Sequence, residues 1–162
     1  GRRDGIPAAT LAEMDKTVEL SAANTGTRLC LAINYGSRGE LVDAVRSIAT
    51  RVKSGELEPG AITEATIAES LYTAGMPEPD LLIRTAGEMR LSNFLLWEMA
   101  YAEIHIAPVY WPDFRRDHLY GALADYLTRE RRFGKTSEQL LDEHGAQRAT
   151  VMKKLLDAIK RK

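Results

Sequence analysis

Two arginines and a serine lie in one short stretch of this 162-residue chain. The stretch from Arg84 to Asn93 reads RTAGEMRLSN and stands between two apolar runs. A guanidinium group is planar and matches two phosphate oxygens at once, and a serine hydroxyl adds a further donor. Arg84, Arg90 and Ser92 therefore form a candidate site for a phosphate or diphosphate. The same spacing also allows a plainer arrangement, in which Arg84 pairs with Glu88 and Arg90 faces water.

A carboxylate further along the chain could do a second kind of chemistry. Glu103 interrupts an apolar stretch at the point where a strand is expected to begin. Carboxylate oxygens are ligands that Mg²⁺ prefers, so Glu103 is a candidate metal ligand. A single carboxylate also fits an ordinary ion pair, and the spacing leaves both roles open. His105 and His118 are interpreted as a strand residue and a helix-surface residue without a chemical role.

Short apolar runs that alternate with helical patterns must position these residues. This alternation predicts an α/β domain with a mainly parallel sheet flanked by helices. Cys30, in the first of the runs, is expected to be a small buried residue. Strands are expected at residues 28–35, 81–85 and 103–110, and helices at residues 7–24, 40–54, 62–72, 92–101 and from 111 onward.

The predicted sheet gives the arginine stretch its place. In open parallel sheets, ligands bind beyond the carboxyl ends of the strands, and Arg84 lies at such an end. Ser92 is expected to cap the helix over residues 92–101, whose first N–H groups would add to an anion site. Three strands leave two sheet edges exposed, which suggests that further strands come from upstream or from a partner.

Composition restricts the classes of protein and partner. The net charge is −1 and the basic residues are dispersed among acids, so nucleic-acid binding has no support. The one cysteine cannot form an internal disulfide, which favours a reducing, cytoplasmic location. No apolar stretch approaches the ~20 residues that cross a bilayer. The chain starts with Gly1 in a turn-like sequence, so we expect a processed chain or a piece of a longer one.

Longer stretches of the sequence carry a family resemblance. They read DLLIRTAGEMRLSNFLLWEMAYAEIHIAPVYWPDF over residues 80–114, NTGTRLCLAINYGSRGELVDAVR over 24–46 and RERRFG over 129–134. All three resemble segments of the cis-prenyltransferase family, which includes undecaprenyl-diphosphate synthase (isoprenyl transferase). The resemblance implies that residues 1–134 are the C-terminal portion of a Rossmann-like cis-prenyltransferase domain, incomplete at its N-terminus. The charged residues 135–162 are expected to form a helical tail.

The resemblance also implies an activity and its participants. The family condenses isopentenyl diphosphate with an allylic diphosphate such as farnesyl diphosphate, using Mg²⁺, and makes a polyprenyl diphosphate. Arg84, Arg90 and Ser92 would bind the diphosphate of isopentenyl diphosphate, and Leu91 would contribute through its backbone. Glu103 would help to hold Mg²⁺, in the family across a homodimer interface. The apolar product could bring the protein to a membrane surface without insertion of the chain.

The chain departs from the family's pattern in what it lacks. The family's N-terminal segment carries a phosphate-binding loop with a metal-binding aspartate, and nothing in residues 1–162 matches it. No catalytic residue is therefore assigned, and this chain alone is predicted not to catalyse chain elongation. Smaller departures are Ser37 and Ala86, which stand where glycine is common, and Met89, whose thioether is a poor Mg²⁺ ligand.

Three functions are to be distinguished. The first is the portion of an enzyme just described. The second is a non-catalytic partner subunit of a heteromeric cis-prenyltransferase, and the third is a generic phosphate-binding domain. The intact arginines, Ser92 and Glu103 favour the first, because a scaffold subunit has little need for a complete diphosphate site. The long match over SNFLLWEMAYAE, residues 92–103, argues against the third.

Overall fold

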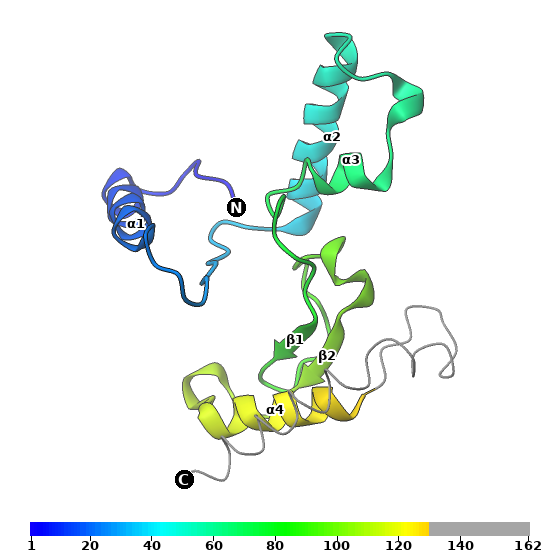
Figure 1. The fold of residues 1–162 in the computed structure, drawn as a ribbon. Helices are drawn as coiled ribbons and strands as arrows, with labels where there is room; N and C mark the ends of the chain where they lie inside the picture. The colour runs from blue at the N-terminus through cyan, green and yellow to red at the C-terminus, as the bar shows by residue number, and fades with distance from the viewer. Residues whose placement is uncertain (130–162) are drawn as a thin grey trace. The chain divides into compact units, whose positions relative to one another are not determined.

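The computed structural model describes residues 1–129, and the predicted tail over residues 135–162 lies outside them. Contacts divide the chain into two units, which are described separately. The first unit consists of residues 1–77 and 92–97, and the second contains, among the described residues, 78–91 and 98–129. Figure 1 labels the helices and strands of both. Within this described part, none of the helices has the length and apolar character needed to cross a membrane.

Helices are the regular elements of the first unit. They are α1 (Ala8–Ser21), α2 (Ser37–Lys53), the 3-10 turn η1 (Pro59–Ala61) and α3 (Glu64–Ala68). α1 begins directly after Pro7, as the sequence predicted. Thr63 caps α3, because its hydroxyl accepts a hydrogen bond from the Thr66 N–H. α3 itself is shorter than the helix expected at residues 62–72.

The core of the first unit lies along one side of α2. Ser37, Glu40, Ala44 and Ile48 recur every three or four residues, share one face of the helix and are buried. α3 contacts α2, and Leu71 from the segment after α3 is buried as well. α1, by contrast, buries none of its residues.

The strand predicted over residues 28–35 is not formed. Among the described residues nothing pairs with this segment as a strand, and Leu29 and Leu31 are 80% and 67% exposed. Cys30 is exposed too, so the prediction of a buried cysteine was wrong. β-propensity reflects the fit of a side chain to a paired, half-buried sheet surface. Without a neighbouring strand, the apolar pattern has no ladder to join.

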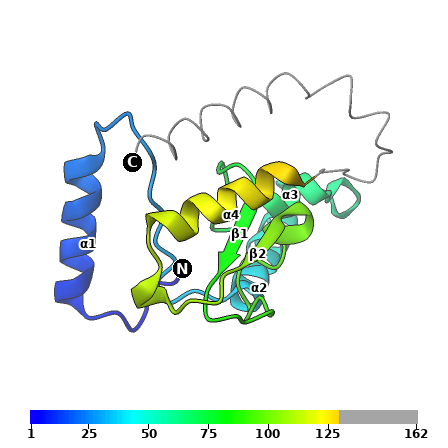
Figure 2. The ribbon, with the colours of Figure 1, turned by 90° about the horizontal axis from the view of Figure 1, so that it is seen from below.

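A parallel pair of strands and one long helix form the second unit. Its elements are β1 (Leu81–Arg84), the 3-10 turns η2 (Glu98–Tyr101) and η3 (Trp111–Asp113), β2 (Glu103–Ile106) and α4 (Arg116–Thr128). The register of the two strands sets Arg84 opposite Ile106. α4 packs against β2, as Figure 2 shows from below. Met99, Ala107 and Ala122 are buried apolar residues of this unit.

This architecture confirms the predicted α/β class and the parallel pairing, with two strands among residues 1–129 where three were expected. The helix predicted over residues 92–101 is replaced by turns and η2, so Ser92 is not a helix N-cap. The reason lies in the backbone. Ser92, Asn93 and Leu95 have φ values of 49°, 61° and 47°, which are incompatible with a right-handed helix.

Candidate functional site

A tight turn follows Arg84 at the end of β1. Ala86 donates its N–H to the Val109 carbonyl oxygen at 2.8 Å, and Gly87 donates to that of Ala107 at 3.0 Å. The turn is therefore fastened to the residues that follow β2. Ala86 has a φ of 62°, a left-handed conformation that costs a non-glycine residue about 1 kcal/mol. Alanine at this position thus introduces backbone strain two residues from Arg84.

Both arginines of the quoted stretch meet on one carboxylate. Arg84 donates from Nη2 to Oε2 of Glu88, and Arg90 donates from its Nη2 to Oε1. The side chains of Arg84 and Glu88 are 32% and 31% exposed, whereas that of Arg90 is 68% exposed. The hydrogen bond from Arg84, with the positive charges of Arg90 and Arg84, holds the pKa of Glu88 below its usual value. The plainer pairing of Arg84 with Glu88 is therefore formed, and Arg90 joins it.

This convergence has a chemical meaning beyond the ion pair. Guanidinium groups that both reach one carboxylate could also bind the oxygens of one phosphate. Leu91 follows Arg90 directly and is half-buried in the same unit. Ser92, the next residue, belongs to the first unit.

The turn that contains Ser92 is held by α2. The Asn93 carbonyl oxygen accepts from the Ser37 N–H at 2.9 Å, and Asn93 Oδ1 accepts from the Arg38 N–H at 2.8 Å. The Ser37 hydroxyl oxygen accepts from the Leu96 N–H at 3.0 Å. Neither Asn93 nor Ser37 was expected to have this role from the sequence, in which Ser37 was only a departure from the family pattern. Asparagine tolerates a left-handed backbone, and this was the one local signal in the sequence. The contact itself could not be predicted, because Arg38 lies 55 positions from Asn93.

Glu103, at the start of β2, forms the ion pair that was the plainer of its two roles. Its Oε2 accepts from Arg129 Nη1 at 3.0 Å. Arg129 also donates to the carbonyl oxygen of Ile104 at 2.8 Å and to Asp125 Oδ2 at 2.7 Å. The same oxygen of Asp125 lies 2.7 Å from His105 Nδ1. Hydrogen bonds from His105 and Arg129 hold the pKa of Asp125 below its usual value.

No ready-made metal centre accompanies Glu103. Within residues 1–129, no group of three or more His, Cys, Asp or Glu side chains could hold a metal ion. His105 is a strand residue, as predicted, and is occupied by Asp125. His118 lies in α4, where its Nδ1 accepts from the Arg115 N–H at 3.0 Å, a structural role at the start of the helix.

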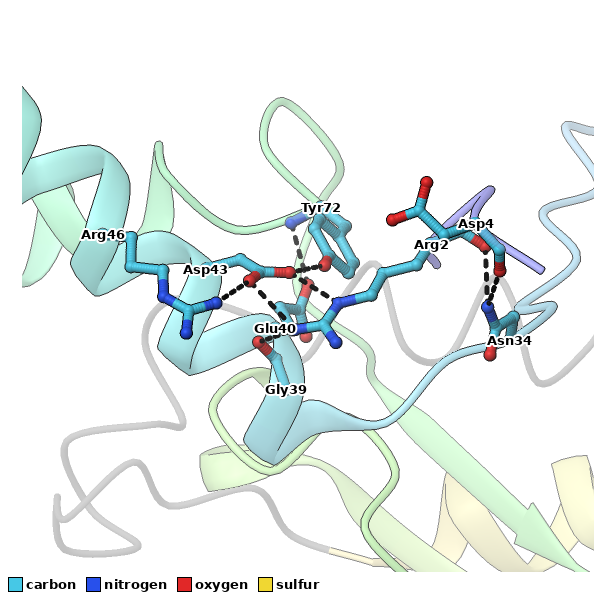
Figure 3. Close-up of polar contacts among 8 residues, drawn as sticks. All are labelled: Arg2, Asp4, Asn34, Gly39, Glu40, Asp43, Arg46 and Tyr72. Atoms are coloured by element: carbon cyan, nitrogen blue, oxygen red, sulfur yellow. Dashed lines mark hydrogen bonds and ion pairs between the residues drawn. The ribbon is translucent and has the colours of Figure 1, made fainter.

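An ionic network around α2 was not anticipated from the sequence. Arg2 donates from Nε and Nη2 to both carboxylate oxygens of Asp43, at 2.8 and 2.9 Å (Figure 3). Tyr72 donates its hydroxyl to Asp43 and its N–H to Glu40 Oε1, the latter at 2.8 Å. Hydrogen bonds from Arg2 and then Tyr72 lower the pKa of Asp43 to about 2, and the contact with Asp43 raises the pKa of Tyr72. The network ties the start of the chain and the segment after α3 to α2.

The lowered pKa of Asp43 predicts a specific dependence of stability on pH. Asp43 has an ordinary pKa of 3.8, and its folded value is about 2. Its ionised form therefore stabilises the fold above about pH 4, and this contribution is lost as the pH falls toward 2. We expect Asp43→Asn to flatten the fall in the free energy of unfolding over that interval, measured by urea denaturation. Asp4→Asn, whose side chain takes no part in these contacts, is the matched control, and equal slopes in wild type and Asp43→Asn would contradict the assignment.

Residues 1–134 match the prenyltransferase family model of undecaprenyl diphosphate synthase. The isoprenyl transferase of Geobacter sulfurreducens is 46% identical over 140 residues, which cover 86% of this chain and 57% of that protein. The isoprenyl transferase of Chlorobaculum tepidum is 49% identical over 140 residues, with shares of 86% and 53%. The chain thus spans about half the length of the curated relatives that it matches.

The similarity extends to three dimensions. The crystal structure of lavandulyl diphosphate synthase from Lavandula x intermedia, in complex with dimethylallyl diphosphate, matches with a TM-score of 0.81 and 42% sequence identity. The match covers 83% of this chain and 58% of that one. The extent of the family match and the identity with curated relatives lead to one conclusion: this chain belongs to the undecaprenyl diphosphate synthase family of isoprenyl transferases.

Proposed function

We propose that this chain supplies the isopentenyl diphosphate site of a cis-prenyltransferase. The whole enzyme would join isopentenyl diphosphate to an allylic diphosphate such as farnesyl diphosphate, and a polyprenyl diphosphate would be formed. The observation that carries the proposal is the meeting of Arg84 and Arg90 on Glu88 at the carboxyl end of β1. An anion site built on two arginines at that end of a parallel strand is where α/β folds commonly bind ligands.

Ligand binding would exchange one anion for another. A diphosphate carries more negative charge than the Glu88 carboxylate, so the guanidinium hydrogen bonds would pass from Glu88 to phosphate oxygens. Leu91 would contribute through its backbone, and Ser92 through its hydroxyl. Such contacts orient the ligand, and positioning and charge stabilisation are the main tasks when an allylic diphosphate departs.

Glu103 would supply one carboxylate to a Mg²⁺ ion, within a homodimer. Mg²⁺ is commonly held by one or two carboxylates together with water and substrate phosphates, so a single carboxylate fits one place in such a site. Because Glu103 Oε2 bonds to Arg129, that oxygen would exchange the guanidinium for the metal, or the second oxygen would serve. When bound, the metal would offset negative charge on a diphosphate.

Binding of isopentenyl diphosphate to the 162-residue chain, measured by isothermal titration calorimetry with Mg²⁺ present, tests the proposal. Arg90→Ala is expected to weaken binding about tenfold, because a hydrogen bond from a charged group is worth roughly 1.5 kcal/mol. Arg116→Ala removes an exposed arginine from the start of α4 and serves as the matched control. It should bind as the wild type does.

Two other outcomes carry weight in the same experiment. Unchanged affinity in a folded Arg90→Ala variant would show that the quoted stretch is structural. A wild-type chain that folds and binds no isopentenyl diphosphate would favour the non-catalytic partner subunit. Whatever the binding result, we expect this chain alone to form no elongated product from the two diphosphates, because nothing in its sequence matches the family's aspartate loop.

A further inference from the structure

We infer that Asn93 is a positioning residue for isopentenyl diphosphate, which fixes the turn that presents Ser92 by clamping it to the first turn of α2. The inference rests on the proposed function, in which the Ser92 hydroxyl contacts the diphosphate. Asn93 acts through the turn and not through contact with the ligand.

The Ser92 turn needs support from outside itself. Ser92, Asn93 and Leu95 all have positive φ, at 49°, 61° and 47°. Each such residue costs roughly 1–2 kcal/mol when it is not glycine, and asparagine tolerates the conformation best. Without contacts from elsewhere in the protein, these residues would adopt the more favourable conformations with negative φ, and the turn would be lost.

α2 provides those contacts at three points. The Ser37 N–H donates to the Asn93 carbonyl oxygen, and the Arg38 N–H donates to Asn93 Oδ1. In return, the Ser37 hydroxyl oxygen accepts the N–H of Leu96, beyond the turn. Asn93 therefore engages two successive N–H groups of the helix, one with its backbone and one with its side chain. These two groups are occupied by protein and are unavailable to an anion.

The fit around the Asn93 side chain is close. A Cβ atom added to Gly36, the residue before α2, would lie 2.7 Å from Asn93 Nδ2. Such a distance is shorter than any van der Waals contact, so the asparagine amide rests directly on the glycine backbone. The absence of a side chain at Gly36 therefore leaves space for the Asn93 amide.

The first turn of α2 is itself rigidly held. Ser37 and Glu40 are 0% and 1% exposed, and Glu40 accepts the hydroxyl of Tyr35 and the N–H of Tyr72. The ring of Tyr35 packs edge to face against that of Phe94, with centroids 5.7 Å apart. The residue next to Asn93 is thus fixed to the same buried support, and a positioned hydroxyl binds a ligand without an added ordering cost.

A double-mutant cycle separates this role from a merely structural one. Affinity for isopentenyl diphosphate is measured by calorimetry for the wild-type chain, Asn93→Ala, Ser92→Ala and the double variant. We expect Asn93→Ala to weaken binding about fivefold in the wild-type background, the value of one ordinary hydrogen bond. In the Ser92→Ala background it should weaken binding less than about twofold, because the group that it positions is gone. Asn24→Ala, an exposed asparagine in the segment before the clamp, is the matched control.

Each remaining outcome decides the inference. Equal losses in the two backgrounds, or no loss from Asn93→Ala in a folded chain, would overturn it while leaving the proposed function in place. A wild-type chain that binds no isopentenyl diphosphate would overturn the proposed function and this inference with it. Should Asn93→Ala fail to fold, Asn93→Gly removes the same acceptor and adopts the left-handed φ without strain, so the cycle is repeated with glycine.

Discussion

Replacing Arg84 with alanine is expected to weaken binding of isopentenyl diphosphate about a hundredfold, the largest effect of any single change at the site. A hydrogen bond from a charged group contributes up to roughly 3 kcal/mol, and each 1.4 kcal/mol is a factor of about ten. We expect Arg84 to approach that limit, because its side chain is only 32% exposed to water and its backbone is held at the end of β1. Arg90 is 68% exposed and more screened by water, which is why its replacement is expected to cost less.

Arg84→Lys separates charge from geometry in the same calorimetric measurement. Lysine keeps the positive charge and loses the planar fork that binds two oxygens at once. We expect its affinity to lie between those of the wild type and Arg84→Ala. Thermal unfolding of all three proteins checks that the sheet is intact. If Arg84→Ala and Arg116→Ala bind isopentenyl diphosphate equally well, the end of β1 is not the diphosphate site.

Glu40→Ala is expected to lower the free energy of unfolding by about 3 kcal/mol. Glu40 is 1% exposed, and its carboxyl group accepts from the Tyr72 N–H and the Tyr35 hydroxyl. Alanine would leave both donors without this acceptor and would open a cavity in the core beside α2. Each lost hydrogen bond costs about 0.5–1.5 kcal/mol, and the lost volume of the buried side chain adds to this. Urea denaturation followed by circular dichroism measures the change.

Two controls define the source of that loss. Glu40→Gln keeps an oxygen acceptor and nearly the same volume, so it should destabilise the chain less than alanine does. Glu19→Ala removes an exposed glutamate from α1, where substitutions change stability by about 0.5 kcal/mol or less. A Glu40→Ala variant as stable as Glu19→Ala would mean that the buried carboxyl group does not hold the first unit together.

Local patterns in the sequence predicted the elements that depend on local properties. The 3.6-residue periodicity located α2 and α4, and the apolar runs located β1 and β2. Arg84 was placed correctly at a strand end, and its pairing with Glu88 was one of the two arrangements considered. The class of fold followed from the alternation of these elements. The family was identified from the ordered motifs rather than from any single residue.

Features that depend on distant partners could not be predicted in the same way. Residues 28–35 have a strand's composition, yet a strand forms only where another backbone pairs with it. Glu103 pairs with Arg129, 26 positions away, and spacing alone could not choose between that cation and a metal. A turn forms at Ser92 in place of the expected helix because N–H groups of α2 donate hydrogen bonds to it. Local sequence propensity contains no information on such distant donors.

Left-handed residues other than glycine are concentrated in one region of the described chain. The described chain has five such residues, at positions 34, 86, 92, 93 and 95. Three of them lie within the stretch of residues 84–93, and the fourth, Leu95, lies two residues beyond it. Glycine would relieve the strain at such positions and would also let the backbone leave the conformation that it now keeps. If the proposed diphosphate site is correct, stability and ligand binding are therefore opposed in this segment. A variant selected only for heat resistance would tend to change these residues first, and it would lose the fixed backbone on which the proposed site depends.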